Sequence, residues 1–372
     1  MMSVMSEWMR DDTPLRSHAK AGVVILLAGL ALFGLALAVV GPHHAFDFRN
    51  AYLSAAHAIA EGRSPYPAEG AWVIENDRAY VYPPTLAALL VPLTLLPEWL
   101  AVLLWTSLGV ATIAGSLWLL AVRDVRVYAV ACMWAPVYTA VQNGNASLLI
   151  MLLAAITWRF RDRAGAAGIA AGLAIALKLF VWPLIVWLLV TRRFRAAAVT
   201  TGSAVAFVAG SWALIGFEGI ARYRSLIEEL TRTALDLSHS ITSVFVEVGL
   251  PRTAGIAASF VVGGLLLAAC VRAARRDDEL GALALALTAG LAIVPILWQH
   301  HLLVLLVPLA VARPRLSWPW FAFVPTWVCF LAGYGELWQQ ALVLSATAAV
   351  VVTCTTTTPR GALSPEPIPA HP

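Results

Sequence analysis

The chain has 372 residues, of which 60% are hydrophobic and only 12% are charged, and its mean hydropathy is +0.79. A soluble globular protein carries about 25% charged residues, so this composition excludes an ordinary soluble domain and predicts an integral membrane protein. The formal net charge of +4 comes from short arginine clusters between apolar runs, which mark cytoplasmic loops and not a surface for nucleic acid.

The first predicted span covers about residues 21–40, after a polar segment, residues 1–20, that we expect in the cytoplasm. This span is too long for the core of a signal peptide, and no small-residue cleavage pattern follows it. We therefore interpret it as a retained anchor with the N-terminus inside. Residues 41–82 then form a first outer loop.

An amphipathic helix is predicted within this first outer loop. Phe48, Tyr52, Ala55 and Ile59 recur at helical spacing, whereas polar residues fall elsewhere. Such a segment, residues 48–61, suits the surface of a membrane.

The rest of the chain is predicted to be a single all-α domain, residues 21–354, with about 10–12 transmembrane spans. A second outer loop is expected at residues 216–252, and the tail, residues 355–372, is rich in Thr and Pro and is predicted to be disordered. The further apolar segments lie at about 83–97, 99–121, 126–141, 146–158, 164–190, 197–215, 254–271, 280–297, 301–312, 319–334 and 338–353.

Two membrane topologies are compatible with the sequence up to residue 192. If 164–190 is one broken span, the loop 159–163 falls outside, against its positive charge. If 164–190 is a hairpin, one earlier segment must be re-entrant. From Arg192 onward the alternation is regular and places the turn at Trp298–His301 outside.

Lys178 is the charged residue whose predicted position within the membrane costs the most free energy. A charged side chain in a bilayer costs about 2.5–3.5 kcal/mol on insertion scales, which makes it a functional candidate. A snorkelling lysine near a helix end is the alternative. Pro183 follows soon afterwards and favours a broken helix that lines a polar cavity.

Other polar residues gather where spans end. His300 and His301 lie at an outer turn, where they are either an interfacial pair or functional; two adjacent histidines do not make a helical metal site. A cluster around Asn145 is either a simple turn or part of a site. Asp47 either caps the following helix or does chemistry.

These residues, in this order, resemble glycosyltransferase family 87, a GT-C-type membrane family that includes polyprenyl-phosphate-mannose-dependent mannosyltransferases and some arabinofuranosyltransferases. The resemblance covers about residues 40–310. It is carried by the segments Asp47–Ala58, Gly62–Tyr66, Tyr82–Pro84, Gly172–Lys178 and Trp298–Leu302. The sequence departs from the family in Gly144-Asn145-Ala146-Ser147, where the family often has Gly-Gln-x-Asn, and in Ser238-His239-Ser240, where an Asn-Gln-Ser motif is common.

The resemblance implies a hexosyl- or pentosyltransferase of the plasma membrane that moves one sugar, with mannose first among the candidates. The donor would be a polyprenyl-phosphate sugar, and the acceptor a hydroxyl of a lipid or glycan at the extracytoplasmic face. The reaction would be inverting and would need no metal or other cofactor.

The resemblance also implies roles for individual residues. Asp47 is expected to be the catalytic base. The donor phosphate is expected to bind Arg49, Lys178, His300 and His301. Contacts with sugar or acceptor are expected from Tyr52, Tyr66, Tyr82, Asn145, His239 and Trp298. The competing class is a transporter or lipid flippase of the cell envelope, which would show internal repeats between its halves; no convincing repeat is present.

Overall fold

The structure is a computed structural model that describes residues 44–68, 71–76, 78–330 and 335–356. Every regular element in these ranges is helical, which confirms the all-α fold. The first expected span, the N-terminal segment 1–20 and residues 357–372 lie outside the described residues. The last described helix continues to Thr356, two residues into the tail that the sequence predicted to be disordered.

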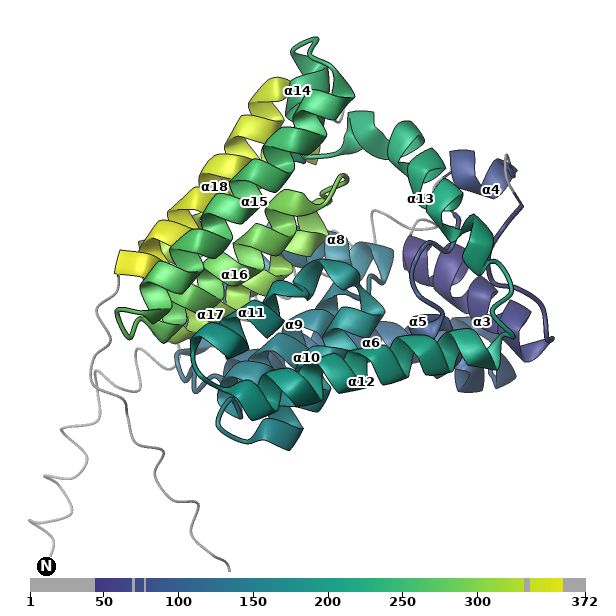
Figure 1. The fold of residues 1–372 in the computed structure, drawn as a ribbon, viewed down its shortest axis with the longest axis horizontal. Helices are drawn as coiled ribbons and strands as arrows, with labels where there is room; N and C mark the ends of the chain where they lie inside the picture. Colours follow the sequence, from purple (N-terminus) through teal and green to yellow (C-terminus); the bar gives the residue numbers. More distant parts are fainter. Residues whose placement is uncertain (1–43, 69–70, 77, 331–334, 357–372) are drawn as a thin grey trace, which may run out of the picture.

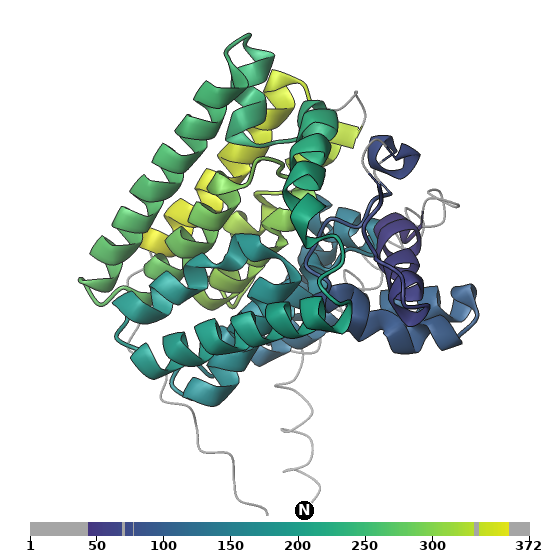
Figure 2. The ribbon, with the colours of Figure 1, turned by 45° about the vertical axis from the view of Figure 1, so that its right-hand side comes forward.

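The helices between residues 48 and 95 lie on one flank of the molecule, beside the long helix α6 (Figures 1 and 2). They are η2 (Phe48–Leu53, a π-helix), α3 (Ser54–Ala60), α4 (Trp72–Glu75), α5 (Thr85–Leu90) and η3 (Val91–Leu95). The apolar face of η2 and α3 is buried inside the protein, where Phe48 stacks on Trp105 of α6 with ring centroids 5.1 Å apart. The amphipathic helix is therefore present, but its apolar side packs on other helices and not on lipid.

The next helices form the layer that carries Lys178. They are α6 (Glu98–Leu119), α7 (Val125–Cys132), α8 (Ala135–Asn143), α9 (Ser147–Arg159), α10 (Ala164–Leu177), η4 (Leu179–Val181), α11 (Pro183–Val190) and α12 (Phe194–Leu214). Prolines explain two of the breaks, because a proline ring clashes with the carbonyl four residues earlier and donates no hydrogen bond. Pro136 separates α7 from α8, and Pro183 begins α11.

The C-terminal half forms a second bundle, reached through α13, which extends from α14 towards α4 in both views (Figures 1 and 2). Its elements are α13 (Ile220–Ala234), η5 (Leu235–Leu237), α14 (Ile241–Glu247), α15 (Arg252–Ala274), α16 (Glu279–Ile293), η6 (Gln299–Leu305), α17 (Leu306–Ala312), η7 (Trp318–Phe321), η8 (Pro325–Phe330) and α18 (Leu337–Thr356). In the described part of the expected segment 319–334, Pro319 and Pro325 restrict the chain to short 3-10 turns.

Four described helices, α6, α12, α15 and α18, are long and apolar enough to cross a membrane. Shorter apolar helices accompany them in six further segments, among them α9, α10 and α16. The shorter helices are mostly buried by their neighbours, whereas less than a third of the apolar window of α12 and of α15 is buried. The chain is thus a polytopic helical membrane protein, as its composition predicted.

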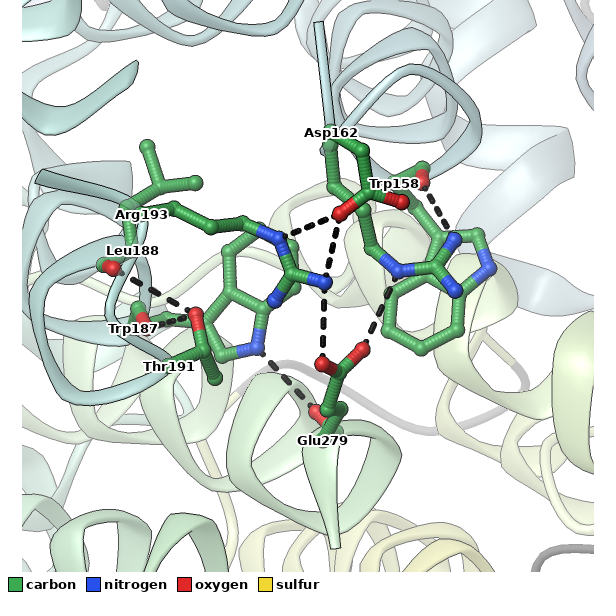
Figure 3. Close-up of polar contacts among 8 residues, drawn as sticks. Trp158, Asp162, Trp187, Leu188, Thr191, Arg193 and Glu279 are labelled. Carbon is green, nitrogen blue, oxygen red and sulfur yellow. Dashed lines mark hydrogen bonds and ion pairs between the residues drawn. The ribbon is translucent and has the colours of Figure 1, made fainter. Parts of the chain in front are cut away.

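An ion-pair cluster shows how the segment 164–190 is arranged (Figure 3). Arg193, just after α11, donates to Asp162, just before α10, with Nη2 to Oδ1 at 2.8 Å. Glu279, at the start of α16, accepts from Arg193 at 2.9 Å and from Arg161 at 3.1 Å. Both ends of the segment therefore lie at one end of the molecule, and Lys178 lies at the tip of a hairpin.

This finding resolves the choice that the sequence left open. The hairpin places the loop 159–163 beside the arginines that follow α11, in agreement with its positive charge. With the N-terminus inside, as the sequence predicts, we expect the segment 83–97 to be the one that does not cross the membrane. Both ends of this segment lie beside η2. At its start, the ring of Tyr82 lies 5.7 Å from that of Tyr52, and at its end Glu98 pairs with Arg49.

The ion-pair cluster should contribute to stability. Glu279 neutralises two arginines, and the side chain of Arg193 is only 14% exposed, so Glu279→Gln should lower the free energy of unfolding by about 1–3 kcal/mol, between the values for exposed and buried pairs. Thermal unfolding in detergent measures this. The matched control is Glu228→Gln, whose partner Arg224 is 90% exposed, and it should change stability by less than about 0.5 kcal/mol. Equal effects in the two variants would contradict the prediction.

Candidate active site

The approach of Asp47 to Asn145 depends on a glycine. Gly144 ends α8 in the left-handed conformation, with φ +61°, and a Cβ at this position would lie 2.9 Å from Cβ of Phe48. Only glycine therefore lets the segment before η2 pack against the end of α8. The amide of Ala45 donates to Gln142 O at 2.6 Å, and the indole of Trp105 donates to Gly144 O at 2.7 Å. These contacts fix both chain segments.

Asp47 and Lys178 are linked through the side-chain amide of Asn145. Asn145 Nδ2 donates to Asp47 Oδ2 at 2.5 Å, and Asn145 Oδ1 accepts from Lys178 Nζ at 2.8 Å. The same oxygen accepts from the backbone and the hydroxyl of Ser147, at 3.0 and 2.9 Å. Every contact requires the same orientation of the amide, so the arrangement is determined by its partners.

The position of Asp47 excludes the capping role that the sequence left open. Its backbone is already helical, with φ −64° and ψ −40°, and its side chain makes no capping hydrogen bond to η2. An N-cap residue instead has extended backbone and accepts from the first turn. The carboxylate is therefore directed to Asn145 and not to its own helix.

Lys178 and His301 direct protons into the same space. The backbone N–H of Trp298 donates to His301 Nδ1 at 3.2 Å, which assigns the proton of a neutral ring to Nε2. His301 Nε2 lies 3.3 Å from Lys178 Nζ, and a charged lysine only donates. Two donors so close together favour an anionic oxygen as their common acceptor. Nε2 of the adjacent His300, which is 5% exposed, has no hydrogen-bond partner among the described residues.

Two aromatic rings, those of Tyr82 and Tyr52, pack beside Lys178. Lys178 Nζ lies 4.8 Å from the centre of the Tyr82 ring, and the Tyr52 ring meets Tyr82 edge-on. Tyr52 is buried, whereas Asp47 and Tyr82 are half-buried. Lys178 therefore lies in the interior of the protein, whereas part of the surface of Asp47 is exposed.

Three tyrosine hydroxyls hold the backbone that carries Tyr82. Tyr223 of α13 donates to Val81 O at 2.9 Å. Tyr66 donates to Tyr82 O at 2.8 Å, and Tyr80 donates to Pro83 O at 2.6 Å. Three consecutive carbonyls are thus bound by side chains, and α13 of the second outer region is connected to the site.

Removal of one of these hydroxyls should reduce turnover without unfolding the protein. In Tyr223→Phe the ring is retained but the hydrogen bond to Val81 O is lost, at a cost of about 1 kcal/mol, or about fivefold in kcat/KM if Tyr82 is displaced. The control is Tyr128→Phe, which loses the same kind of bond, to Val122 O at 3.0 Å, on a different part of the chain. Sugar transfer per folded molecule is measured together with Tm. The interpretation fails if both variants lose activity equally, or if neither does.

Some residues that the sequence grouped with the site lie apart from it. Arg49 is exposed and binds Glu98 at 2.6 Å. Tyr66 is buried behind Tyr82 and stacks on Trp212, with ring centroids 5.1 Å apart. Trp298 contacts His301 through its backbone amide. The roles expected for their side chains remain predictions.

His239 lies next to the turn that carries the two histidines. Its backbone amide donates to Leu297 O at 2.8 Å, and its side chain is 2% exposed. Burial lowers the pKa of His239 to about 4, so its ring is neutral near pH 7. Nδ1 is buried and has no hydrogen-bond partner among the described residues. The contact with sugar or acceptor that the sequence predicted for His239 remains a prediction.

Sequence reasoning missed several residues of this site. Gln299 is buried, and neither of its amide atoms has a hydrogen-bond partner within the described part of the chain. Its position between Trp298 and His300, two residues that the sequence did single out, could have identified it as part of the site. Ser147 also lay in a quoted segment, whereas no pattern identified Tyr80 or Tyr223 as supports for Tyr82.

Comparison with known proteins assigns the chain to a family. Residues 80–298, more than half of the chain, match glycosyltransferase family 87. The chain belongs to glycosyltransferase family 87. The matched part includes Asn145 and Lys178. The two histidines lie just beyond its C-terminal end, and Asp47 lies well before its start. Membership excludes a transporter as the primary assignment, and the resemblance noted from the sequence is confirmed.

Two curated relatives bear the same name, polyprenol-phosphate-mannose-dependent alpha-(1-2)-phosphatidylinositol pentamannoside mannosyltransferase. The Mycobacterium tuberculosis protein is 28% identical over 294 residues, which cover 70% of this chain and 67% of the relative. The Mycolicibacterium smegmatis protein is 25% identical over 292 residues, 70% of each chain. No solved structure matches the chain. This family 87 chain is therefore a membrane glycosyltransferase with distant mannosyltransferase relatives.

Proposed function

We propose that this family 87 chain transfers one mannose from a polyprenyl-phosphate donor to a hydroxyl of a lipid or glycan acceptor. The names of both relatives specify a polyprenol-phosphate-mannose donor and a phosphatidylinositol mannoside acceptor, which supports the donor class. The observation that carries the proposal is the continuous contact from Asp47 through Asn145 and Lys178 to His301. It joins a base to a set of phosphate-binding donors.

Asp47 acts in this proposal as the general base. A carboxylate that is within hydrogen-bond reach of the acceptor hydroxyl takes its proton as the oxygen attacks the anomeric carbon. Asn145 holds one oxygen of the carboxylate, and Asp47 is only half-buried, so an acceptor hydroxyl can approach it. A single displacement from this side inverts the configuration of the anomeric carbon.

Lys178, His300 and His301 stabilise the leaving group. As the bond between sugar and phosphate breaks, negative charge grows on the lipid phosphate, and donors that are already fixed lower the energy of this transition state. Lys178 is 2% exposed, so water screens its charge little. The N–H of His301 Nε2 points to the same place, and His300 Nε2 offers a further buried ring nitrogen.

We further infer that the reaction needs no metal ion or other cofactor. Lys178 lies between His301 and Asn145, where its positive charge can neutralise the donor phosphate in place of a metal cation. The same charge repels a metal ion from this position.

The sidedness of the site follows from the loops at the opposite end of the molecule. Arg161 and Arg193 lie in turns at the base of the hairpin whose tip is Lys178. Since arginine-rich loops stay in the cytoplasm, the tip and the site belong to the extracytoplasmic face. This supports a plasma-membrane enzyme that uses a lipid-linked donor where nucleotide sugars are absent.

Incubation of membranes that contain the chain with a panel of labelled polyprenyl-phosphate sugars tests the proposal. Mannose should be transferred to lipid or glycan, and membranes that contain Asp47→Asn serve as the control. Transfer of another sugar would revise the donor. Failure to use any polyprenyl-phosphate sugar, in membranes where the folded protein is detected, would refute the proposed function.

A further inference from the structure

An apolar groove lies between α15, α16 and α18, which are neighbours in both views (Figures 1 and 2). Its volume is about 270 Å³. The walls include Leu266 of α15, Leu291 of α16 and Ala348 of α18. An apolar cavity of roughly 150 Å³ accommodates benzene, so this groove has room for about two five-carbon units of a hydrocarbon chain.

The groove is apolar throughout, although two threonines line it. The hydroxyl of Thr288 donates to Ala284 O at 2.7 Å, and that of Thr347 donates to Val343 O at 2.9 Å, both within their own helices. Their hydrogen-bonding capacity is used there, so these side chains offer the groove little besides methyl groups. A hydrocarbon therefore suits the groove better than a sugar or a phosphate.

One end of the groove adjoins the candidate active site. Leu297 and Leu302, which line it, are 4% and 1% exposed and stand on either side of the turn that carries His300 and His301. The other end lies at the molecular surface, where the lining residue Val352 is 57% exposed. The groove thus runs from the lipid-facing side of the bundle to the turn with the two histidines.

We propose that this groove binds the first isoprene units of the donor's polyprenyl chain. The proposal rests on the proposed function and specifies where its donor is held. The donor's chain is joined to the transferred sugar through a single phosphate, so its first carbons must lie beside the groups that bind this phosphate. In the acceptor that the relatives' names specify, several sugars separate the lipid from the reacting hydroxyl. A lipid groove beside the histidines therefore fits the donor and not the acceptor.

The groove sets the position of the donor more than its affinity. A hydrocarbon chain that leaves the bilayer for an apolar groove gains little from the hydrophobic effect, because lipid is equally apolar. What the groove supplies is a fixed path that presents the phosphate to Lys178 and the histidines. Obstruction of this path should displace the phosphate, and a misplacement of about 1 Å can cost on the order of 100-fold in rate.

Leu266→Trp tests the groove, and Leu265→Trp is its matched control. Leu266 lines the groove, whereas its neighbour Leu265 is 66% exposed and lies outside it. With a long-chain polyprenyl-phosphate mannose, Leu266→Trp should lower kcat/KM for the donor by roughly 10- to 100-fold, and Leu265→Trp should change it less than about twofold. With a donor in which a methyl group replaces the polyprenyl chain, the groove stays empty, and both variants should match the unsubstituted protein. The KM for the acceptor should remain constant.

Other outcomes would overturn the proposal. A rise in acceptor KM would assign the groove to the acceptor's acyl chains. Equal losses with long and short donors would mean that the substitution acts on the protein in general. Unchanged kinetics with every donor would mean that ordinary bilayer lipid fills the groove. Ala348→Phe, which obstructs the same groove from α18, repeats the comparison if Leu266→Trp does not fold.

A measurement without turnover separates this proposal from the proposed function. Polyprenyl phosphate with a photoreactive group on its first isoprene units should label peptides of α15, α16 or α18 in the unsubstituted protein, and Leu266→Trp should reduce the labelling. Labelling elsewhere would refute the groove even if mannose is transferred. Labelling here without transfer from any donor would refute the proposed function and leave the groove in place.

Discussion

Asp47→Asn should lower sugar transfer by roughly 10²- to 10⁴-fold, the contribution of a positioned general base. The new amide has the same shape, and its oxygen can still accept from Asn145 Nδ2, so the fold and the donor site should remain intact. The loss should appear in kcat, because the base acts on the acceptor proton in the transition state and not on the bound donor.

The measurement is the initial rate with saturating donor and acceptor, on protein whose folding is checked by its Tm. Asp236→Asn is the matched control, because Asp236 is an exposed aspartate of the second outer region and should tolerate the change. Full activity of Asp47→Asn would remove Asp47 from its role as base. An equal loss in Asp236→Asn would point to a general effect of charge.

Lys178→Met should mainly weaken donor binding. Methionine has a similar length, so the substitution removes the charge without leaving a large cavity, and Asn145 Oδ1 still accepts from Ser147. Truncation of one partner of a buried charge pair costs about 2–5 kcal/mol of binding free energy. The dissociation constant of the donor should therefore rise by roughly 30-fold or more.

Competition by polyprenyl phosphate, which is the product and lacks the sugar, measures this binding without turnover. Each of the two variants serves as the control for the other. Asp47→Asn should bind polyprenyl phosphate as the unsubstituted protein does, whereas Lys178→Met should not. If Lys178→Met binds it with unchanged affinity, the lysine does not hold the phosphate, and its contact with Asn145 has a different purpose.

Much of this arrangement could be predicted because its cause is local in the sequence. Lys178 in an apolar run and Pro183 five residues later predicted a broken segment, and the structure has a hairpin with the lysine at its tip. The turn that carries His300 and His301 was predicted from the span pattern, and the structure has it between α16 and α17. The side of the membrane on which it lies stays a prediction.

Other features depend on contacts between distant segments and carry no local signal. The hairpin alternative could be chosen only once Arg193 was seen beside Asp162 and Glu279. The bridge formed by Asn145 needs the close packing at Gly144, which the sequence showed only as a glycine in a turn. The sequence also contained no sign that Arg49, two residues after Asp47, pairs with the distant Glu98.

Asp47, Asn145, Lys178 and His301 each come from a place where the chain reverses direction or begins a helix at the same end of the molecule. During membrane insertion, each of these turns reaches that end only if the preceding segments have the correct orientation. A copy with one helical pair inserted in the opposite sense lacks at least one member of the site. Under the proposed function, misinserted copies should therefore be inactive and should not consume lipid-linked sugar on the wrong leaflet.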